Sequence, residues 1–137
     1  MSRGRHPSAV TYADLAIDRF RQWPLTACRA DCPPGRALSL PDRQIVHLHR
    51  GDLAEVHLTR PVISRLTTTL AASGRVDILP GTAWVEVHLE ADNDLFLLES
   101  LVSLAIQAND PTHPRDPIAY CPQAVPGSRR RTPLSRA

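Results

Sequence analysis

Residues 44–58 read QIVHLHRGDLAEVHL and are the most informative part of this sequence. Apolar and polar side chains alternate over residues 45–49 and again over residues 53–58, and a short connection containing Gly51 joins the two runs. Alternation with a period of two is typical of β-strands, and a short glycine-containing link between two such runs is typical of a hairpin. The stretch therefore predicts two neighbouring antiparallel strands.

Pairing across this connection predicts which residues of the two strands lie opposite each other. The expected pairs are His49 with Leu53, His47 with Glu55, and Ile45 with His57. Side chains alternate between the two faces of a sheet, so one face of the hairpin is apolar and should be covered by helices. This apolar face consists of Val46, Leu48, Ala54, Val56 and Leu58.

The opposite face of the hairpin is polar and rich in histidine. If the alternating segment 84–89 joins the same sheet with its valines inward, its other side chains extend this face. The predicted histidine face then consists of His47, His49, Glu55, His57, Trp84, Glu86 and His88. Neighbouring imidazole and carboxylate groups can ligate a metal or transfer protons near neutral pH. Three interpretations stay open: a solvent-facing surface, a catalytic or ligand-binding face, and a metal site.

The remaining secondary structure follows from periodicity and from turn residues. Apolar residues at helical spacing predict helices over about residues 11–22, 61–72 and 91–109. Thr11 is a suitable N-cap, Pro24 stops the first helix, and Gly74 suits the end of the second. Further extended segments are expected at residues 25–29, 36–40, 75–79 and 84–89. This order predicts an α+β fold in which three helices pack on one face of a mostly antiparallel sheet.

Composition divides the chain into one domain with a disordered segment at each end. The domain is expected at residues 11–109, after a polar segment at residues 1–10. Residues 110–137 are rich in Pro, Arg, Ser and Thr, and bury too little apolar surface to offset the entropy cost of ordering. Arg129, Arg130 and Arg131 in this tail are interpreted as solvated rather than as a nucleic-acid contact.

Length and composition exclude several classes of protein. The 137 residues are 42% hydrophobic with a formal net charge of +2, which fits one globular domain and no second one. Without 18 consecutive apolar residues or a secretory signal, a cytoplasmic protein with no membrane contact is expected. The cysteines Cys28, Cys32 and Cys121 are odd in number and lack CxxC spacing, which favours reduced thiols over a metal knuckle. The sequence contains no glycine-rich phosphate loop, nucleophile elbow or HExxH motif.

Several short motifs follow one another in order between residues 12 and 109. They are His47-Leu48-His49, Asp52-Leu53-Ala54-Glu55, Ser73-Gly74-Arg75, Trp84-Val85-Glu86-Val87 and a final Leu-rich helix. In this order they resemble the small luciferase-domain family, which contains bacterial proteins and the fungal luciferases. Two positions depart from that family's pattern. It commonly has aspartate where Glu55 stands, and a His-rich segment where this chain has Ile78-Leu79-Pro80-Gly81.

The resemblance implies a function for the histidine face. Fungal members oxidise a hydroxypyrone with molecular oxygen and no redox cofactor, so a related chain would bind or oxidise a small aromatic or pyrone-type molecule. Neither a cofactor nor a metal is expected. The residues expected in catalysis are His47 and His49, either of which would remove a proton, and Arg75, which would stabilise the resulting anion. The residues expected to bind substrate are Glu55, His57, Trp84, Glu86 and His88.

A different class of protein remains open. The same face would also suit a non-catalytic module that binds a small molecule or a partner protein. Trp84 then serves as a packing residue rather than as the floor of a ligand pocket. The oligomeric state does not follow from the sequence.

Overall fold

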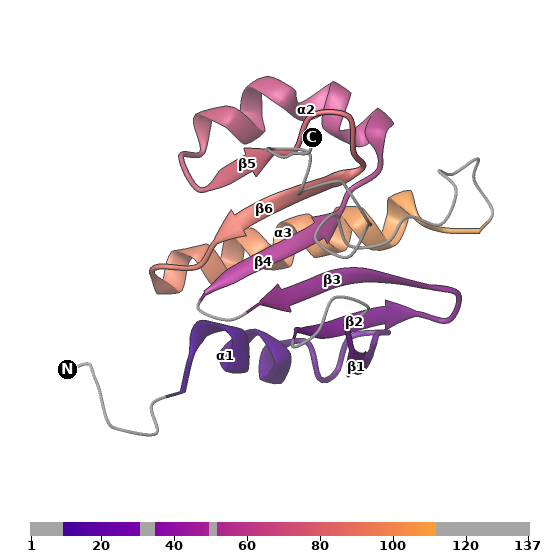
Figure 1. Ribbon diagram of the computed structural model, residues 1–137, viewed down its shortest axis with the longest axis vertical. Helices are drawn as coiled ribbons and strands as arrows, with labels where there is room; N and C mark the ends of the chain where they lie inside the picture. The colour runs from indigo at the N-terminus through magenta and orange to yellow at the C-terminus, as the bar shows by residue number, and fades with distance from the viewer. Residues whose placement is uncertain (1–9, 31–34, 50–51, 112–137) are drawn as a thin grey trace, which may run out of the picture.

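A computed structural model describes residues 10–30, 35–49 and 52–111 of the chain. Its centre is a six-stranded sheet with the strand order β1-β2-β3-β4-β6-β5, in which every neighbouring pair is antiparallel (Figure 1). The strands are β1 (Thr26–Arg29), β2 (Arg36–Leu40), β3 (Arg43–His49), β4 (Leu53–His57), β5 (Val76–Ile78) and β6 (Trp84–His88). The hairpin predicted from residues 44–58 is β3–β4, at the middle of the sheet.

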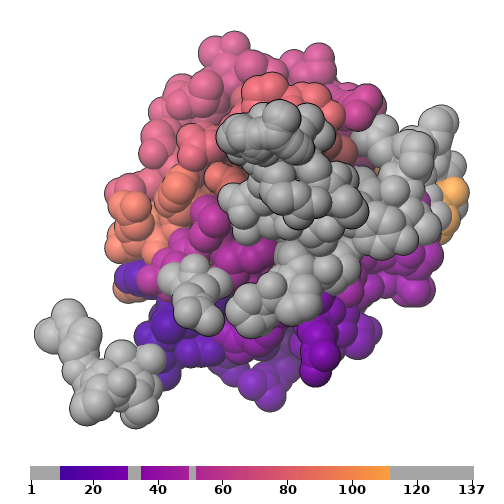
Figure 2. Space-filling view, in the orientation of Figure 1, coloured from indigo at the N-terminus to yellow at the C-terminus, as the bar shows by residue number. Residues whose placement is uncertain are grey.

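Three helices complete the fold: α1 (Tyr12–Arg19), α2 (Arg60–Ala72) and α3 (Asp92–Ala108). Figure 1 shows α3 running behind the sheet, and the space-filling view in the same orientation shows α2 at the upper edge and α1 at the lower edge (Figure 2). Buried side chains from all three helices form a single core with the apolar face of the hairpin. Members of this core include Ala16, Phe20, Val62, Leu70, Leu98 and Val102 from the helices and Val46, Leu48, Ala54 and Val56 from the strands. The predicted α+β fold, with three helices on one face of an antiparallel sheet, is confirmed.

The ends of the helices follow the expected local chemistry with two differences. Thr11 caps α1 in a capping box with Asp14, as predicted, but α1 ends at Arg19 rather than near Gln22. Gly74 follows α2 with a φ of +74°, the left-handed conformation expected of a glycine at that position. Thr59 precedes α2 but makes no side-chain capping bond. Its backbone N–H donates instead to the carbonyl of Ala83.

The register of the β3–β4 hairpin is as predicted for two of its three pairs, His49 with Leu53 and His47 with Glu55. The pairing of β3 with β4 ends at Val46 opposite Val56, so the third expected pair, Ile45 with His57, is not formed. Where β3 pairs with β2, the register shifts at Leu38/Ser39. Leu38 faces Val46 while Ser39 faces Gln44, which leaves Ile45 as the extra residue of a β-bulge. The side chain of Ile45 belongs to the core, and Gln44 reaches the face that carries His47.

Some expectations lie outside the described residues or are not tested by them. Residues 1–9 and 112–137, which include most of the two predicted disordered ends, are outside, as are Cys32, Cys121 and the three consecutive arginines. The domain limits 11–109 therefore stay a prediction. Among the described residues, no helix has both the length and the apolar character needed to cross a lipid bilayer.

Candidate functional site

The centre of the histidine face is Glu55, a carboxylate with 0% of its side chain exposed. One of its oxygens, Oε1, lies 2.7 Å from Nε2 of His49 and 3.7 Å from Nδ1 of His47. The two imidazoles stand two residues apart on β3, so they project from the same face of the sheet, and Glu55 on β4 lies opposite His47. The predicted neighbours therefore form one group, called here the His47–His49–Glu55 cluster.

The cluster is buried rather than solvated. His47 and Glu55 have 0% exposed side chains, and only the imidazole of His49, with 10% exposed, reaches the surface. A carboxylate in such a place is stable only when donors or positive charge surround it, and the hydrogen bond with His49 supplies one such donor. The solvent-facing interpretation does not hold for these residues.

Gln44 determines which nitrogen of His47 carries a hydrogen. Its amide Nε2 donates to the backbone carbonyl of Arg29 at 3.0 Å, which turns its Oε1 toward Nε2 of His47 at 2.9 Å. An amide oxygen only accepts, so Nε2 of His47 is the N–H donor and, in the neutral ring, Nδ1 keeps its lone pair. That lone pair is on the ring nitrogen nearest Glu55.

Trp84 packs between two imidazoles of this face. Its ring stacks on His47 with centroids 4.7 Å apart and an angle of 21°, and it meets His57 edge to face at 5.1 Å. The side chain is 1% exposed, so within this structure it supports the histidines and offers no open surface to a ligand. This arrangement agrees with the packing interpretation of Trp84.

Asn109 is a member of the site that the sequence did not indicate. It ends α3, and its amide nitrogen donates to the carbonyls of His57 at 3.0 Å and Ala105 at 2.8 Å. The amide oxygen is therefore turned to Nδ1 of His57, 2.9 Å away, which must donate. In the sequence, Asn109 is only a residue that ends a helix, and no motif links it to a histidine 52 positions earlier.

Glu86 and His88 lie on the predicted face but belong to a separate, more exposed group. Glu86 lies opposite Glu55 on one side and Asp77 on the other. His88, with 41% of its side chain exposed, pairs through Nε2 with Asp77 at 2.7 Å. The structure thus divides the predicted residues into a buried cluster and an edge group on β5 and β6.

Arg75 is not brought to the cluster. Its guanidinium forms ion pairs with Glu90 and with Asp94, at the beginning of α3, and these are its ion pairs among the described residues. The carboxylates of two residues already neutralise it. The expected role of Arg75 in stabilising an anion beside His47 or His49 has no contact of this kind to support it and stays a prediction.

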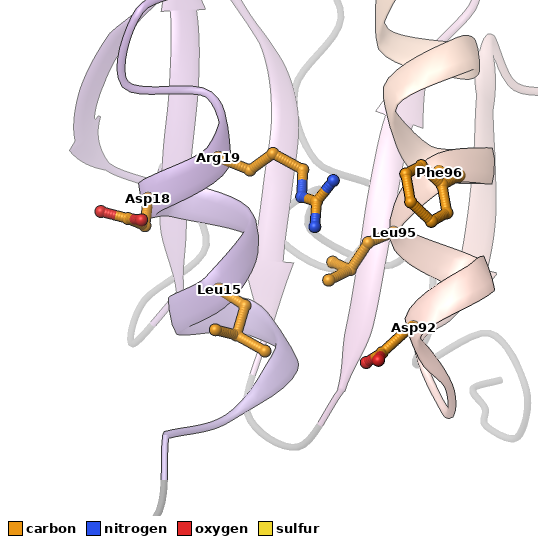
Figure 3. Close-up of a pocket in the computed structure, with 6 residues that line it drawn as sticks. All are labelled: Leu15, Asp18, Arg19, Asp92, Leu95 and Phe96. Carbon is orange, nitrogen blue, oxygen red and sulfur yellow. The ribbon is translucent and has the colours of Figure 1, made fainter.

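An open pocket of about 440 Å³ lies on the other side of the molecule, between α1 and α3 (Figure 3). Arg19 reaches across it, with its guanidinium 5.1 Å from the centroid of the Phe96 ring and 3.5 Å from a carboxylate oxygen of Glu99. Its lining residues are Leu15, Asp18, Arg19, Asp92, Leu95 and Phe96. This lining includes neither a histidine nor a cysteine, so it suits binding better than catalysis.

Two groups of described residues bring together side chains that can ligate a metal. In each group three ligand atoms lie within 4.8 Å of one another. The groups are the His47–His49–Glu55 cluster and the edge group of Asp77, Glu86 and His88. The first group can also move protons, because a carboxylate bonded to one imidazole nitrogen stabilises the protonated ring when the other nitrogen accepts a proton.

Comparison with known proteins found a match to a family model. The family model described as Luciferase domain matches residues 42–105, a range that contains the whole His47–His49–Glu55 cluster and Trp84, but not Asn109. Searches of the curated proteins and of the solved structures found no match. The matched family is the one that the sequence resembles, and the match covers residues 42–105 of this chain.

Proposed function

We propose that the chain binds a small aromatic or pyrone-type molecule at the His47–His49–Glu55 cluster and takes a proton from it. The observation that carries this proposal is the 2.7 Å contact between Nε2 of His49 and the buried carboxylate of Glu55. A buried carboxylate orients an imidazole and stabilises its protonated form, which makes the ring a better general base. His49 is also the member of the cluster that reaches the surface.

The proton transfer would proceed in the following way. With Nε2–H of His49 donating to Glu55, Nδ1 holds the lone pair that accepts a proton from the enol or from an acidic C–H of the ligand. The ligand becomes an electron-rich enolate, and the imidazolium stays beside the Glu55 carboxylate. His47, stacked on Trp84 and bonded to Gln44, lies on the other side of the carboxylate.

Oxidation is the second part of the proposal and rests on the family resemblance. The enolate carbon would give two electrons to molecular oxygen, forming a carbon–oxygen bond. The proton taken by His49 would return to the outer oxygen, so that substrate and oxygen combine into a hydroperoxide with nothing else consumed. No redox cofactor is needed for this balance.

The experiment compares two glutamate variants that differ in their distance from the site. Glu55→Gln keeps the shape of the side chain but removes the charge beside His49, whereas Glu90→Gln makes the same change at an exposed position paired with Arg75. Binding of a panel of phenols and hydroxypyrones is followed by NMR of the histidine ring protons. We expect Glu55→Gln to weaken binding of the ionised ligand by at least tenfold. It should slow any oxygen uptake by about 10²-fold or more, because His49 loses the carboxylate that orients it as a general base.

Two further variants complete this experiment. His49→Ala should abolish the change in the ligand's pKa that accompanies binding. Glu90→Gln should behave as the unchanged chain does. Equal binding and turnover in the unchanged chain and in Glu55→Gln would contradict the proposal.

A non-catalytic binding module is the alternative, and one observation favours it. Phe96 and Leu15, in the pocket between α1 and α3, are 56% and 39% exposed, so this pocket presents apolar surface to a ligand. Ligand-induced shifts confined to Leu15, Leu95 and Phe96, with unchanged histidine signals, would support this alternative.

A further inference from the structure

We infer that the His47–His49–Glu55 cluster is a binding site for a divalent transition-metal ion. The inference concerns the residues of the proposed function. It depends on that function only for what the metal would do, not for whether it binds. Three observations support it: the spacing of the ligand atoms, the hydrogen-bond state of His47, and the chemistry of the donor set.

The spacing of the three ligand atoms is close to that of a metal shell. The three ligand atoms lie within 4.8 Å of one another, and two of the separations are 2.7 Å and 3.7 Å. Metal–nitrogen and metal–oxygen bonds of about 2.0–2.2 Å place neighbouring ligands roughly 3.0–3.4 Å apart in octahedral or tetrahedral geometry. Small movements of the Glu55 side chain would bring both separations into that range, while the strands keep their positions.

The hydrogen-bond state of His47 favours a cation at this place. Because Gln44 accepts from Nε2 of His47, the neutral ring directs a lone pair from Nδ1 toward the Glu55 carboxylate. Nδ1 of His47 and the Glu55 carboxylate, 3.7 Å apart in a buried site, can therefore both act as ligands of one positive ion. Metal-ligating histidines characteristically donate their second N–H to an oxygen acceptor, and Gln44 provides that acceptor here.

The donor set indicates which metals would bind. Two imidazole nitrogens and one carboxylate oxygen suit zinc, ferrous iron, cobalt or manganese, whereas magnesium and calcium prefer sites made only of oxygen. Three protein ligands leave coordination positions open for other groups. A metal on Nε2 of His49 would replace the hydrogen bond to Glu55, so His49 would no longer serve as the base. In the context of the proposed function, an open position would then take the enol oxygen and stabilise the charge left when its proton is lost.

In the edge group of Asp77, Glu86 and His88, three ligand atoms also lie within 4.8 Å of one another, but the other observations do not extend to this group. Asp77 is exposed, and His88 is already paired with it at 2.7 Å with much of its side chain in water. Among the described residues, no side chain accepts from the other ring nitrogen of His88 as Gln44 accepts from His47. A metal at the edge group is therefore the competing outcome that the experiment must separate from the inference.

The experiment titrates the full chain, stripped with a chelator, with cobalt(II) and zinc(II). Visible cobalt bands and calorimetry should give one ion per chain. His49→Ala and Glu55→Gln should weaken metal binding by at least 100-fold. Gln44→Ala should weaken it by about 10–100-fold, as expected when a ligating histidine loses the hydrogen bond of its other ring nitrogen. His88→Ala should leave the affinity within twofold. Circular dichroism of each variant verifies that it is folded.

The results separate this inference from the proposed function. No metal binding, or binding lost in His88→Ala and kept in Glu55→Gln, would overturn the inference. If pyrone ligands bind equally well to chelator-treated protein, the proposed function stands and the metal has no part in it. If the metal binds to the cluster but no ligand of the panel does, the inference stands and the proposed function fails.

Discussion

At the scale of single residues, Asn109 connects the last helix to the histidine face. Its buried amide donates to the carbonyls of His57 and Ala105 and accepts from Nδ1 of His57 and from Nη1 of Arg43. Only one orientation of the Asn109 amide satisfies both its nitrogen and its oxygen. The amide therefore holds His57 in one tautomer beside Trp84. The position of His57 therefore depends on a residue outside the family match.

Asn109→Ala should destabilise the fold markedly. The change leaves buried polar groups of His57 without the bonds they make to Asn109, and such a loss costs about 1–3 kcal/mol per unsatisfied group. Urea unfolding at neutral pH measures the free energy. Asn93→Ala, on an exposed position of the same helix, is the matched control and should cost almost nothing. Equal stabilities of the two variants would show that the Asn109 bonds contribute little.

At the scale of elements, the start of α1 depends on a carboxylate whose titration can be followed. The pKa of Asp14 lies below its ordinary value of 3.8, first because the backbone N–H of Thr11 donates to it and second because Arg36 pairs with it. A depressed pKa means that the folded chain favours the ionised form. The associated stability is therefore present above about pH 3.8 and is lost as the pH falls through the lower pKa of the folded state.

Asp14→Asn should remove this part of the acid sensitivity. An amide oxygen can still accept from Thr11, so the variant isolates the charge. We expect Asp14→Asn to be less stable than the unchanged chain at pH 7, with the difference shrinking below pH 3.8, in urea unfolding measured at several pH values. Asp18→Asn, an exposed aspartate on the same helix, is the control. A difference that does not depend on pH would contradict the assignment.

The end of α2 provides a test that concerns only the backbone. A Cβ added to Gly74 would meet no atom within 4 Å, so the cost of a side chain comes only from the φ of +74°. Gly74→Ala should lower the free energy of unfolding by about 1 kcal/mol, and Gly74→Asn should lower it less, because asparagine tolerates the left-handed region better. Thermal and urea unfolding of both variants would measure this. Equal stability of the alanine variant would show that the helix end adjusts without strain.

The pairing of the strands was largely predictable from the sequence, except for the expected pair of Ile45 with His57. Alternation and the short connection predict the β3–β4 register because a shift of one residue would exchange the apolar and polar faces. The β-bulge at Ile45 was not predictable from these residues, since it depends on how β2 pairs with β3. The bulge moves Gln44 to the histidine face, where it orients His47.

At the scale of the whole molecule, the two faces of the sheet are buried by different kinds of side chain. Helices α1, α2 and α3 bury their apolar side chains on one face, which accounts for the core. On the other face, His47, Glu55, His57 and Trp84 are also buried. Hydrogen bonds with Gln44, His49 and Asn109 hold the first three of these. A polar group of this kind imposes one arrangement of its members, which is a property that a reactive site needs.

The sequence by itself determined the α+β class, the strands and helices, the hairpin register and the likeness to the luciferase-domain family. These follow from residues near one another in the chain, where period, turn chemistry and caps act locally. Only the tertiary structure decided that the His47–His49–Glu55 cluster is buried, that Arg75 pairs with Glu90 and Asp94, and that Asn109 holds His57. Those facts depend on contacts between segments far apart in sequence, where competing partners are chosen by packing and not by local pattern.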